Sequence, residues 1–98
     1  MMYQIIWSEK ADLQYRKTLV FWNEHTGSST YSEKIILEVE KREALISSNP
    51  LVGRIHNYRN VRRINFLKYF SLIYQIIEDQ VYIIAFWDGR RNPKELKI

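Results

Sequence analysis

The chain has 98 residues, a net charge of +4 and 46% hydrophobic residues, which exclude a disordered chain and predict one domain with a modest core. It has no cysteine, so disulfides and thiolate metal sites are excluded, and two histidines are too few to hold zinc without carboxylates. No apolar run reaches the roughly 18 residues of a membrane span, and no secretory signal is visible. We therefore expect a soluble, cytoplasmic protein without metal or cofactor.

The positive charge is concentrated in the second half of the chain. Residues 1–50 hold six Lys/Arg and seven Asp/Glu, and residues 51–98 hold nine and four, so the halves carry −1 and +5. The stretch between Glu43 and Glu78 has no carboxylate but five basic residues: Arg54, Arg59, Arg62, Arg63 and Lys68. This asymmetry is typical of a chain that binds a polyanion or an acidic protein, and it also fits the solvated edge of a small basic domain.

The first 27 residues predict one strand and one helix. Residues 3–7 are mostly apolar and predict a short strand buried on both faces. Ser8 suits the N-cap of a helix that runs to about His25, and Gly27 suits the left-handed position that ends it. Apolar residues recur on one side of this helix, at Ala11, Tyr15, Leu19 and Trp22.

A second helix follows after a linker of only a few residues. Thr30 and Glu33 have capping-box spacing, and the helix runs to about Ser47, where Asn49-Pro50 stops it. One side of it carries Tyr31, Ile35, Val39, Arg42 and Ile46. The short linker implies an antiparallel helical hairpin. We expect residues 51–59 to form a connecting loop.

The stretch from Asn60 to Trp87 is dominated by β-branched and aromatic residues, which fit a pleated, half-buried surface. It predicts three strands at residues 61–66, 69–77 and 81–87, which form an antiparallel meander. The period of two places Phe70, Leu72, Tyr74 and Ile76 on one face of the middle strand and Tyr69, Ser71, Ile73, Gln75 and Ile77 on the other.

The predicted order is β-α-α-β-β-β, an α+β fold in a single domain over residues 1–98. A helical hairpin must bury its apolar stripe and a sheet must bury one face, so both helices should pack on one side of a small, mainly antiparallel sheet. The opposite face is then partly open. The first and last strands are free edges unless they pair with each other.

Five segments recur together in a known family: Ile5-Ile6-Trp7-Ser8 with Ala11, Asp12 and Leu13; Leu45 to Arg54, with the pattern Asn-Pro-x-x-Gly-Arg; Val61-Arg62-Arg63; the strand from Tyr69 to Tyr74; and Phe86 to Pro93, where a basic pair and Asn-Pro follow the last strand. In this order and spacing, which cover nearly the whole chain, the sequence resembles the RelE/ParE superfamily of toxins from bacterial type II toxin–antitoxin systems.

The resemblance implies a growth-inhibiting toxin, of the kind associated with plasmid stabilization, that a cognate acidic antitoxin neutralises. ParE-like members poison DNA gyrase and have no known catalytic residues. RelE-like members are metal-independent endoribonucleases that cut messenger RNA in the ribosomal decoding site. The antitoxin wraps an extended or helical segment around the toxin, which implies antitoxin-binding by this chain.

Arg62 and Arg63 are the candidate catalytic residues, because family members carry an arginine at this place and guanidinium binds phosphate bidentately. Adjacent residues of a strand face opposite sides, so one of the two must point away from the open face of the sheet, and the sequence does not decide which. Arg54 and Lys68 are candidates for further phosphate contacts.

The acid–base groups that RNA cleavage needs are poorly represented. Ribonuclease members often place a His or Tyr near the end of the last strand, where Trp87 and Asp88 stand here. They also carry an arginine after the first hairpin, where Phe70 and Ser71 stand here. We expect His56 to be a surface residue of a flexible loop rather than a catalyst.

The other binding candidates have two interpretations each. Tyr58 and Tyr69 could assist proton transfer or could be packing residues. Trp87 could stack on a base or belong to the core. Arg90 and Arg91 could contact phosphate or an acidic surface, or could form a solvated turn.

We favour a ParE-like toxin that acts by binding DNA gyrase. The alternatives are a RelE-like ribonuclease, whose partner is the ribosome with mRNA, and a non-toxic binding module of the same fold.

Overall fold

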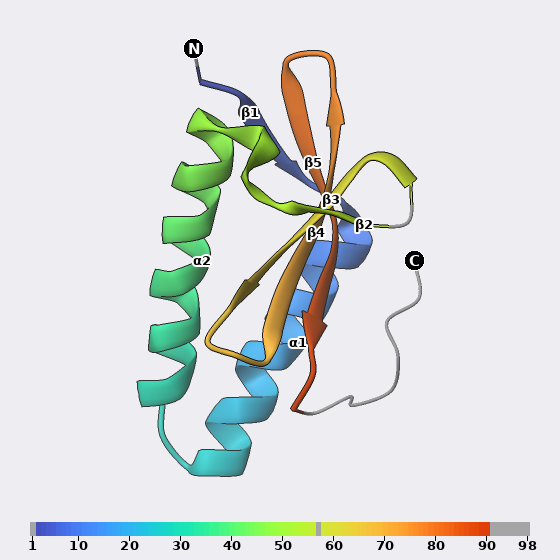
Figure 1. Cartoon of the computed structure of the whole chain (residues 1–98). Coiled ribbons are helices and arrows are strands. Elements are labelled where there is room, and N and C mark those ends of the chain that lie inside the picture. Colours follow the sequence, from blue (N-terminus) through green and yellow to red (C-terminus); the bar gives the residue numbers. More distant parts are fainter. Residues whose placement is uncertain (1, 57, 91–98) are drawn as a thin grey trace.

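The computed structural model describes residues 2–56 and 58–90 and has the predicted α+β architecture (Figure 1). Along the chain, the elements are β1 (Gln4–Trp7), α1 (Glu9–Thr26), α2 (Thr30–Ser48), the 3-10 helix η1 (Pro50–Val52), β2 (Arg54–His56), β3 (Tyr58–Phe66), β4 (Phe70–Ile77) and β5 (Gln80–Asp88). The three predicted strands of the meander are therefore present, each with bounds that differ by up to three residues.

Local chemistry sets the ends of the helices. The Ser8 hydroxyl accepts a hydrogen bond from the backbone N–H three residues on, at 3.0 Å, and Gly27 ends α1 with a φ of 74°, both as predicted. The second cap differs from the prediction. Ser29 rather than Thr30 precedes α2, and its hydroxyl donates to Glu33 Oε2 at 2.6 Å instead of capping the backbone.

The five strands form one sheet in the order β1-β5-β4-β3-β2, in which β1 lies parallel to β5 and the other pairs are antiparallel. The first and last strands therefore pair with each other, and the free edges of the sheet belong to β1 and β2. The prediction that β1 is buried on both faces is wrong. Its residues are half-buried or exposed, because an edge strand has a neighbouring strand on one side only.

The segment predicted to be a loop, residues 51–59, instead contains most of η1, all of β2 and the start of β3. β2 has only three residues, so no alternation could identify it in the sequence. It forms because β3 offers unpaired backbone groups along its edge, and the pairing places Arg54 directly opposite Arg63.

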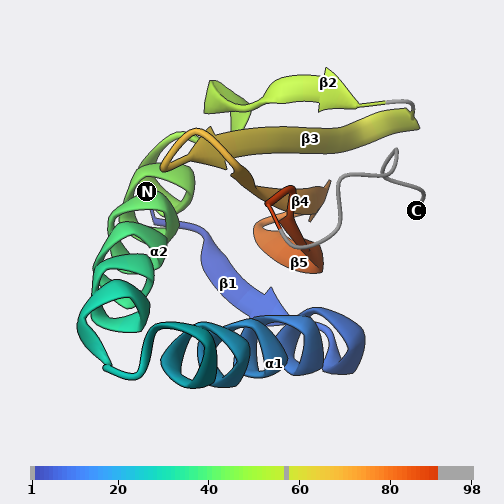
Figure 2. The same cartoon turned by 90° about the horizontal axis from the view of Figure 1, so that it is seen from below.

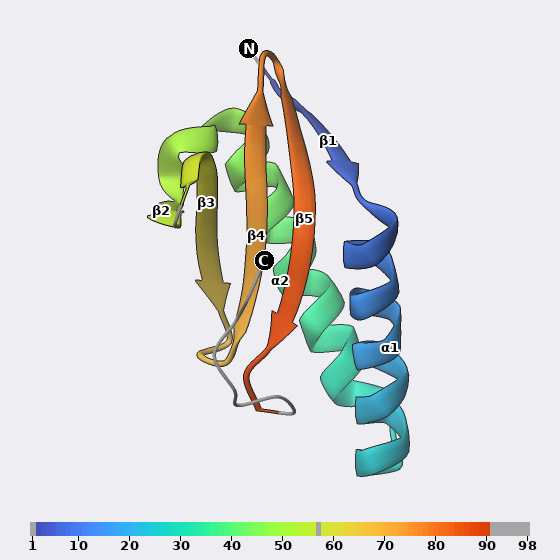
Figure 3. The same cartoon turned by 90° about the vertical axis from the view of Figure 1, so that its right-hand side faces the viewer.

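The core lies between the helical hairpin and one face of the sheet, as Figures 2 and 3 show. The face of β4 that carries Phe70, Leu72 and Tyr74 contacts the helices, and the buried residues of the core also include Trp22, Ile35 and Val39. Tyr15 and Leu19, which we expected to be buried with them, are only half-buried. α1 packs mainly on β5, next to the edge strand, so one flank of the helix stays accessible.

Candidate functional site

The two adjacent arginines of β3 point to opposite faces of the sheet. Arg62 pairs with Tyr74, whose side chain belongs to the core beneath the helices. Its Nη1 donates to the carbonyl oxygen of Gly53 at 2.7 Å and to that of Leu51 at 3.2 Å. Arg62 therefore ties the segment between α2 and β2 to the sheet, and Arg63 is the arginine that faces the open side.

The same segment gives the Asn-Pro-x-x-Gly-Arg pattern a physical reason. The Tyr74 hydroxyl donates to the Pro50 carbonyl at 2.7 Å and accepts from the Gly53 N–H at 2.9 Å. A Cβ at residue 53 would lie 2.6 Å from this hydroxyl oxygen, so glycine is needed for the close approach. Burial raises the pKa of Tyr74, which keeps the hydroxyl protonated and able to donate.

Arg63 is oriented by two neighbours on the open face. Its Nε donates to Asn65 Oδ1 at 3.0 Å and to Ser71 Oγ at 3.1 Å. Ser71 is buried and donates in turn to Asn65 Oδ1 at 2.7 Å. Arg54, across the strand pair, is exposed. Among residues 2–56 and 58–90, neither Arg54 nor Arg63 forms an ion pair with a carboxylate, so two positive charges share this part of the face.

His56 lies at the end of β2 and is half-buried, so the prediction that it belongs to a flexible loop is wrong. Its Nε2 is shielded from solvent and has no hydrogen-bond partner within the part of the chain that the structure describes. Burial and, to a smaller extent, the positive charge of Arg63 lower the pKa of His56. The imidazole is therefore mostly neutral at pH 7.

The centre of the open face is apolar. Val61, Ile73 and Ala85 are buried there, and Ile84 packs against them. Ser71 of β4 pairs with Asn65 of β3 on one side and with Trp87 of β5 on the other, and Trp87 is half-buried. Trp87 therefore belongs to the open face and not to the core under the helices. Since Val61, Ile73 and Ala85 are at most 4% exposed, the accessible part of this face comes from side chains around them, among them the oriented guanidinium of Arg63.

Arg90 lies against a cluster of aromatic rings where β5 ends. Its Cζ lies 4.8 Å from the centroid of the Trp22 ring, 5.6 Å from that of Tyr31 and 5.4 Å from that of Tyr69. Its Nη1 also donates to the Tyr31 hydroxyl at 3.3 Å, and this contact raises the pKa of Arg90. Lys68 Nζ lies 5.4 Å from the centroid of Tyr69, so two cations gather around one ring.

Asp88, at the place where ribonuclease members carry a His or Tyr, is 2% exposed. Its Oδ2 accepts from Trp22 Nε1 at 2.8 Å, and its Oδ1 accepts from the backbone N–H of Arg90 at 3.0 Å. Gly89 follows and donates its N–H to the Tyr69 carbonyl at 2.8 Å. Asp88 thus fixes the end of β5 on the helix side of the sheet.

The candidates from the sequence do not form one site. Arg54, Arg63 and Trp87 lie on the open face, and Arg62 lies on the helix side. Lys68, Tyr69 and Arg90 lie where the turn between β3 and β4 meets the end of β5. Arg91 lies outside the described residues, as does the side chain of Tyr58. Sequence reasoning missed the contacts of Asn65 and Ser71 with Arg63. The period of two places Asn65 on the same face as Arg63, but it says nothing about hydrogen bonds between them.

Within residues 2–56 and 58–90, no group of three or more His, Cys, Asp or Glu side chains could hold a metal ion. In the same part of the chain, no helix is both long and apolar enough to span a bilayer.

Two helices on one face of a mixed five-stranded sheet make up the RelE/ParE-like fold, the class of bacterial toxins from type II toxin–antitoxin systems. The model of one family in this class, described as the ParE toxin of the type II toxin–antitoxin system parDE, matches residues 5–93. The chain belongs to this ParE toxin family. Among curated proteins, none matches its sequence at a significant level.

Solved structures with low sequence identity share the fold. A chain of the chromosomal ParDE toxin–antitoxin system from P. aeruginosa has a TM-score of 0.71 and 14% identity, over 89% of this chain and 96% of that chain. A mutant of the E. coli toxin RelE in the free state has a TM-score of 0.65 and 18% identity, over 95% of this chain and 90% of that chain. A chain of the E. coli DinJ–YafQ toxin–antitoxin complex has a TM-score of 0.53 and 11% identity, over 94% of this chain and 98% of that chain.

Proposed function

We propose that this toxin acts by binding DNA gyrase, as ParE-like members do, and that a cognate acidic antitoxin neutralises it. The observation that carries the proposal is the match of residues 5–93 to the ParE family. The open face supports it. Arginine is one of the residue types that contribute most to protein–protein binding, and Arg63 is held on this face through its Nε alone.

The two side chains that hold Arg63 favour binding over RNA cleavage. Cleavage needs a proton acceptor and a proton donor next to the cation. The two side chains that hold Arg63, those of Asn65 and Ser71, do not titrate in the physiological range. Asp88 is turned into the core against Trp22, away from this face.

An acidic antitoxin suits the charge of the chain. The second half carries +5, and Arg54 and Arg63 stand side by side without a carboxylate partner in the described residues. Carboxylates of the antitoxin would neutralise both and mask the surface that the target needs. The association should weaken as salt rises, because charges at the rim of an interface are screened over about 8 Å at physiological ionic strength, and it should persist through its apolar contacts.

A second candidate function, a RelE-like ribonuclease, is favoured by His56. This imidazole is mostly neutral at pH 7 and close enough to Arg63 to feel its charge, so it could accept a proton next to a cation. If this candidate is correct, His56→Gln abolishes RNA cleavage and toxicity together. Under the gyrase proposal, the same variant remains toxic.

The test is expression of the chain in growing cells, alone and together with the reading frame beside its gene. Gyrase poisoning predicts filamentous cells with an active DNA-damage response, and co-expression of the antitoxin restores growth. Rapid arrest of protein synthesis without a DNA-damage response would contradict the proposal and support the ribonuclease. Normal growth at high expression would contradict both and leave a non-toxic binding module.

A further inference from the structure

The Arg63 side chain is held by a closed triangle of hydrogen bonds with Asn65 and Ser71. Ser71 is 1% exposed, and a buried hydroxyl is costly unless it is hydrogen-bonded. It donates to Asn65 Oδ1 and accepts from Arg63 Nε, and Asn65 Oδ1 also accepts from Arg63 Nε. The hydroxyl is thereby satisfied both as a donor and as an acceptor.

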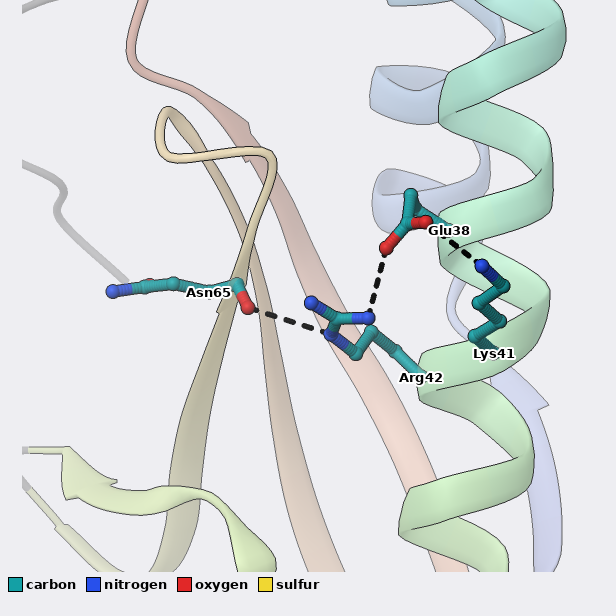
Figure 4. A network of polar contacts seen from close by, with 4 residues as sticks. All are labelled: Glu38, Lys41, Arg42 and Asn65. Atoms are coloured by element: carbon teal, nitrogen blue, oxygen red, sulfur yellow. Dashed lines mark hydrogen bonds and ion pairs between the residues drawn. The ribbon is translucent and has the colours of Figure 1, made fainter.

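Asn65 is itself braced from the other face of the sheet. Its carbonyl oxygen accepts a long hydrogen bond, 3.5 Å, from Nε of Arg42, whose Nη1 pairs with Glu38 Oε1 at 2.9 Å. Figure 4 shows this network and shows the Asn65 side chain directed away from α2. A hydrogen bond from Lys41, followed by the charges of both basic residues, lowers the pKa of Glu38, so the carboxylate stays ionised. Helix α2 thus helps to place the group that holds Arg63.

The triangle uses only one of the five N–H groups of the guanidinium. Within the described residues, neither terminal nitrogen of Arg63 has a hydrogen-bond partner. Their paired geometry matches the two oxygens of a carboxylate or phosphate. Fixing Nε in advance reduces the rotamer freedom that Arg63 would otherwise lose on binding, which strengthens the interaction.

Arg54 indicates that the bound group is an anion. Like charges directly opposite on neighbouring strands are destabilising, and Arg54 faces Arg63 in this way. An oxyanion between the two guanidinium groups would remove the repulsion. Under the proposed function the partner is a protein, so the oxyanion at this position is a carboxylate.

We propose that Asn65 and Ser71 are positioning residues that fix Arg63 through Nε and present its terminal nitrogens, together with Arg54, to a carboxylate of a protein partner. The partner assignment rests on the proposed function. The positioning itself does not, because it concerns the free protein.

The first experiment measures the Nε–Hε signal of Arg63 by NMR in the full chain, assigned by its loss in Arg63→Lys. Wild type should show a sharp signal that exchanges slowly with water, and Ser71→Ala and Asn65→Ala should each broaden it or speed its exchange several-fold. Ser71→Thr keeps a hydroxyl and should retain the slow exchange. Gln75→Ala changes the same face of β4 without touching the triangle and serves as the matched control. A signal unchanged in both alanine variants would overturn the positioning role.

The second experiment titrates the same signals with a hexaglutamate peptide and, separately, with inorganic phosphate. The glutamate peptide should shift the Arg63 signal of wild type more strongly than phosphate does, and each alanine variant should weaken that binding several-fold. Stronger binding of phosphate would overturn the carboxylate assignment and indicate a nucleic acid. Equal binding by wild type and both alanine variants would overturn the inference as a whole. If positioning and carboxylate binding hold while gyrase is unaffected, the proposed target fails and this inference stands.

Discussion

Trp22 and Asp88 are 66 positions apart in the chain and share a buried hydrogen bond, from the indole Nε1 to the carboxylate Oδ2 at 2.8 Å. The contact joins α1 to the end of β5, next to the rings that surround Arg90. Asp88 thus connects the helical hairpin to the basic end of the sheet. Its place in the chain resembles that of a catalytic group, but its surroundings are those of a structural acceptor.

Asp88→Ala should lower the free energy of unfolding by about 1–3 kcal/mol, because it leaves the buried indole N–H of Trp22 without this acceptor. Asp88→Asn retains a carbonyl oxygen and should cost less. Urea denaturation followed by tryptophan fluorescence measures both values. An alanine variant as stable as wild type would show that the hydrogen bond contributes nothing to folding.

Ile35→Ala should destabilise the domain by about 2–5 kcal/mol, because Ile35 is fully buried between α2 and the sheet and its truncation leaves a cavity. Leu37→Ala, two residues along the same helix, should change stability by less than about 0.5 kcal/mol, since Leu37 is 57% exposed. Chemical denaturation of the two variants compares them directly. Similar losses for both would mean that the faces of α2 are assigned wrongly.

Arg62→Ala and Arg63→Ala should have opposite consequences, although the two residues are adjacent. Arg62→Ala removes the hydrogen bonds to two loop carbonyls and should cost about 1–2 kcal/mol of stability. Arg63→Ala should leave the fold nearly unchanged and abolish growth inhibition. Thermal melts and growth curves of both variants test this pair. Full toxicity in a folded Arg63→Ala variant would place the toxic surface elsewhere.

The stability of the protein should fall at alkaline pH because of Tyr15. Burial, together with the charges of Glu43 and Glu40, raises its pKa from 10.0 to about 12. The unfolded chain therefore loses this proton first, so the stabilising contribution is complete below pH 10 and disappears as the pH rises toward 12. It amounts to less than about 2.7 kcal/mol, since Tyr15 is only half-buried and water screens its interactions.

Unfolding experiments between pH 8 and 12 on wild type and Tyr15→Phe measure this contribution. The phenylalanine variant lacks the titrating hydroxyl, so its stability should decline less over the last two pH units. Parallel curves for the two proteins would contradict the role of Tyr15.

Most of the fold follows from periodicity and caps in the sequence. The alternation in β4 correctly assigned Leu72 and Ile73 to opposite faces, because only one face meets the helices. β2 could not be predicted in the same way. Three residues carry no periodic signal, and the strand exists only because η1 and Gly53 deliver the chain to the edge of β3.

The candidate site was predictable in part. Strand geometry required Arg62 and Arg63 to face opposite sides, but only the path of the segment around Gly53 decides that Arg62 is the one bound to the loop. The contacts of Ser71 with Arg63 join two strands, and their hydrogen bonds depend on a register that no local pattern encodes.

The most direct measurement of the central claim is DNA supercoiling by purified gyrase in the presence of the purified chain. Wild type should inhibit supercoiling, Arg63→Ala should not, and Gln75→Ala should inhibit as wild type does. The claim would be contradicted if a wild-type chain that arrests cell growth left supercoiling by purified gyrase unchanged and cleaved messenger RNA on ribosomes.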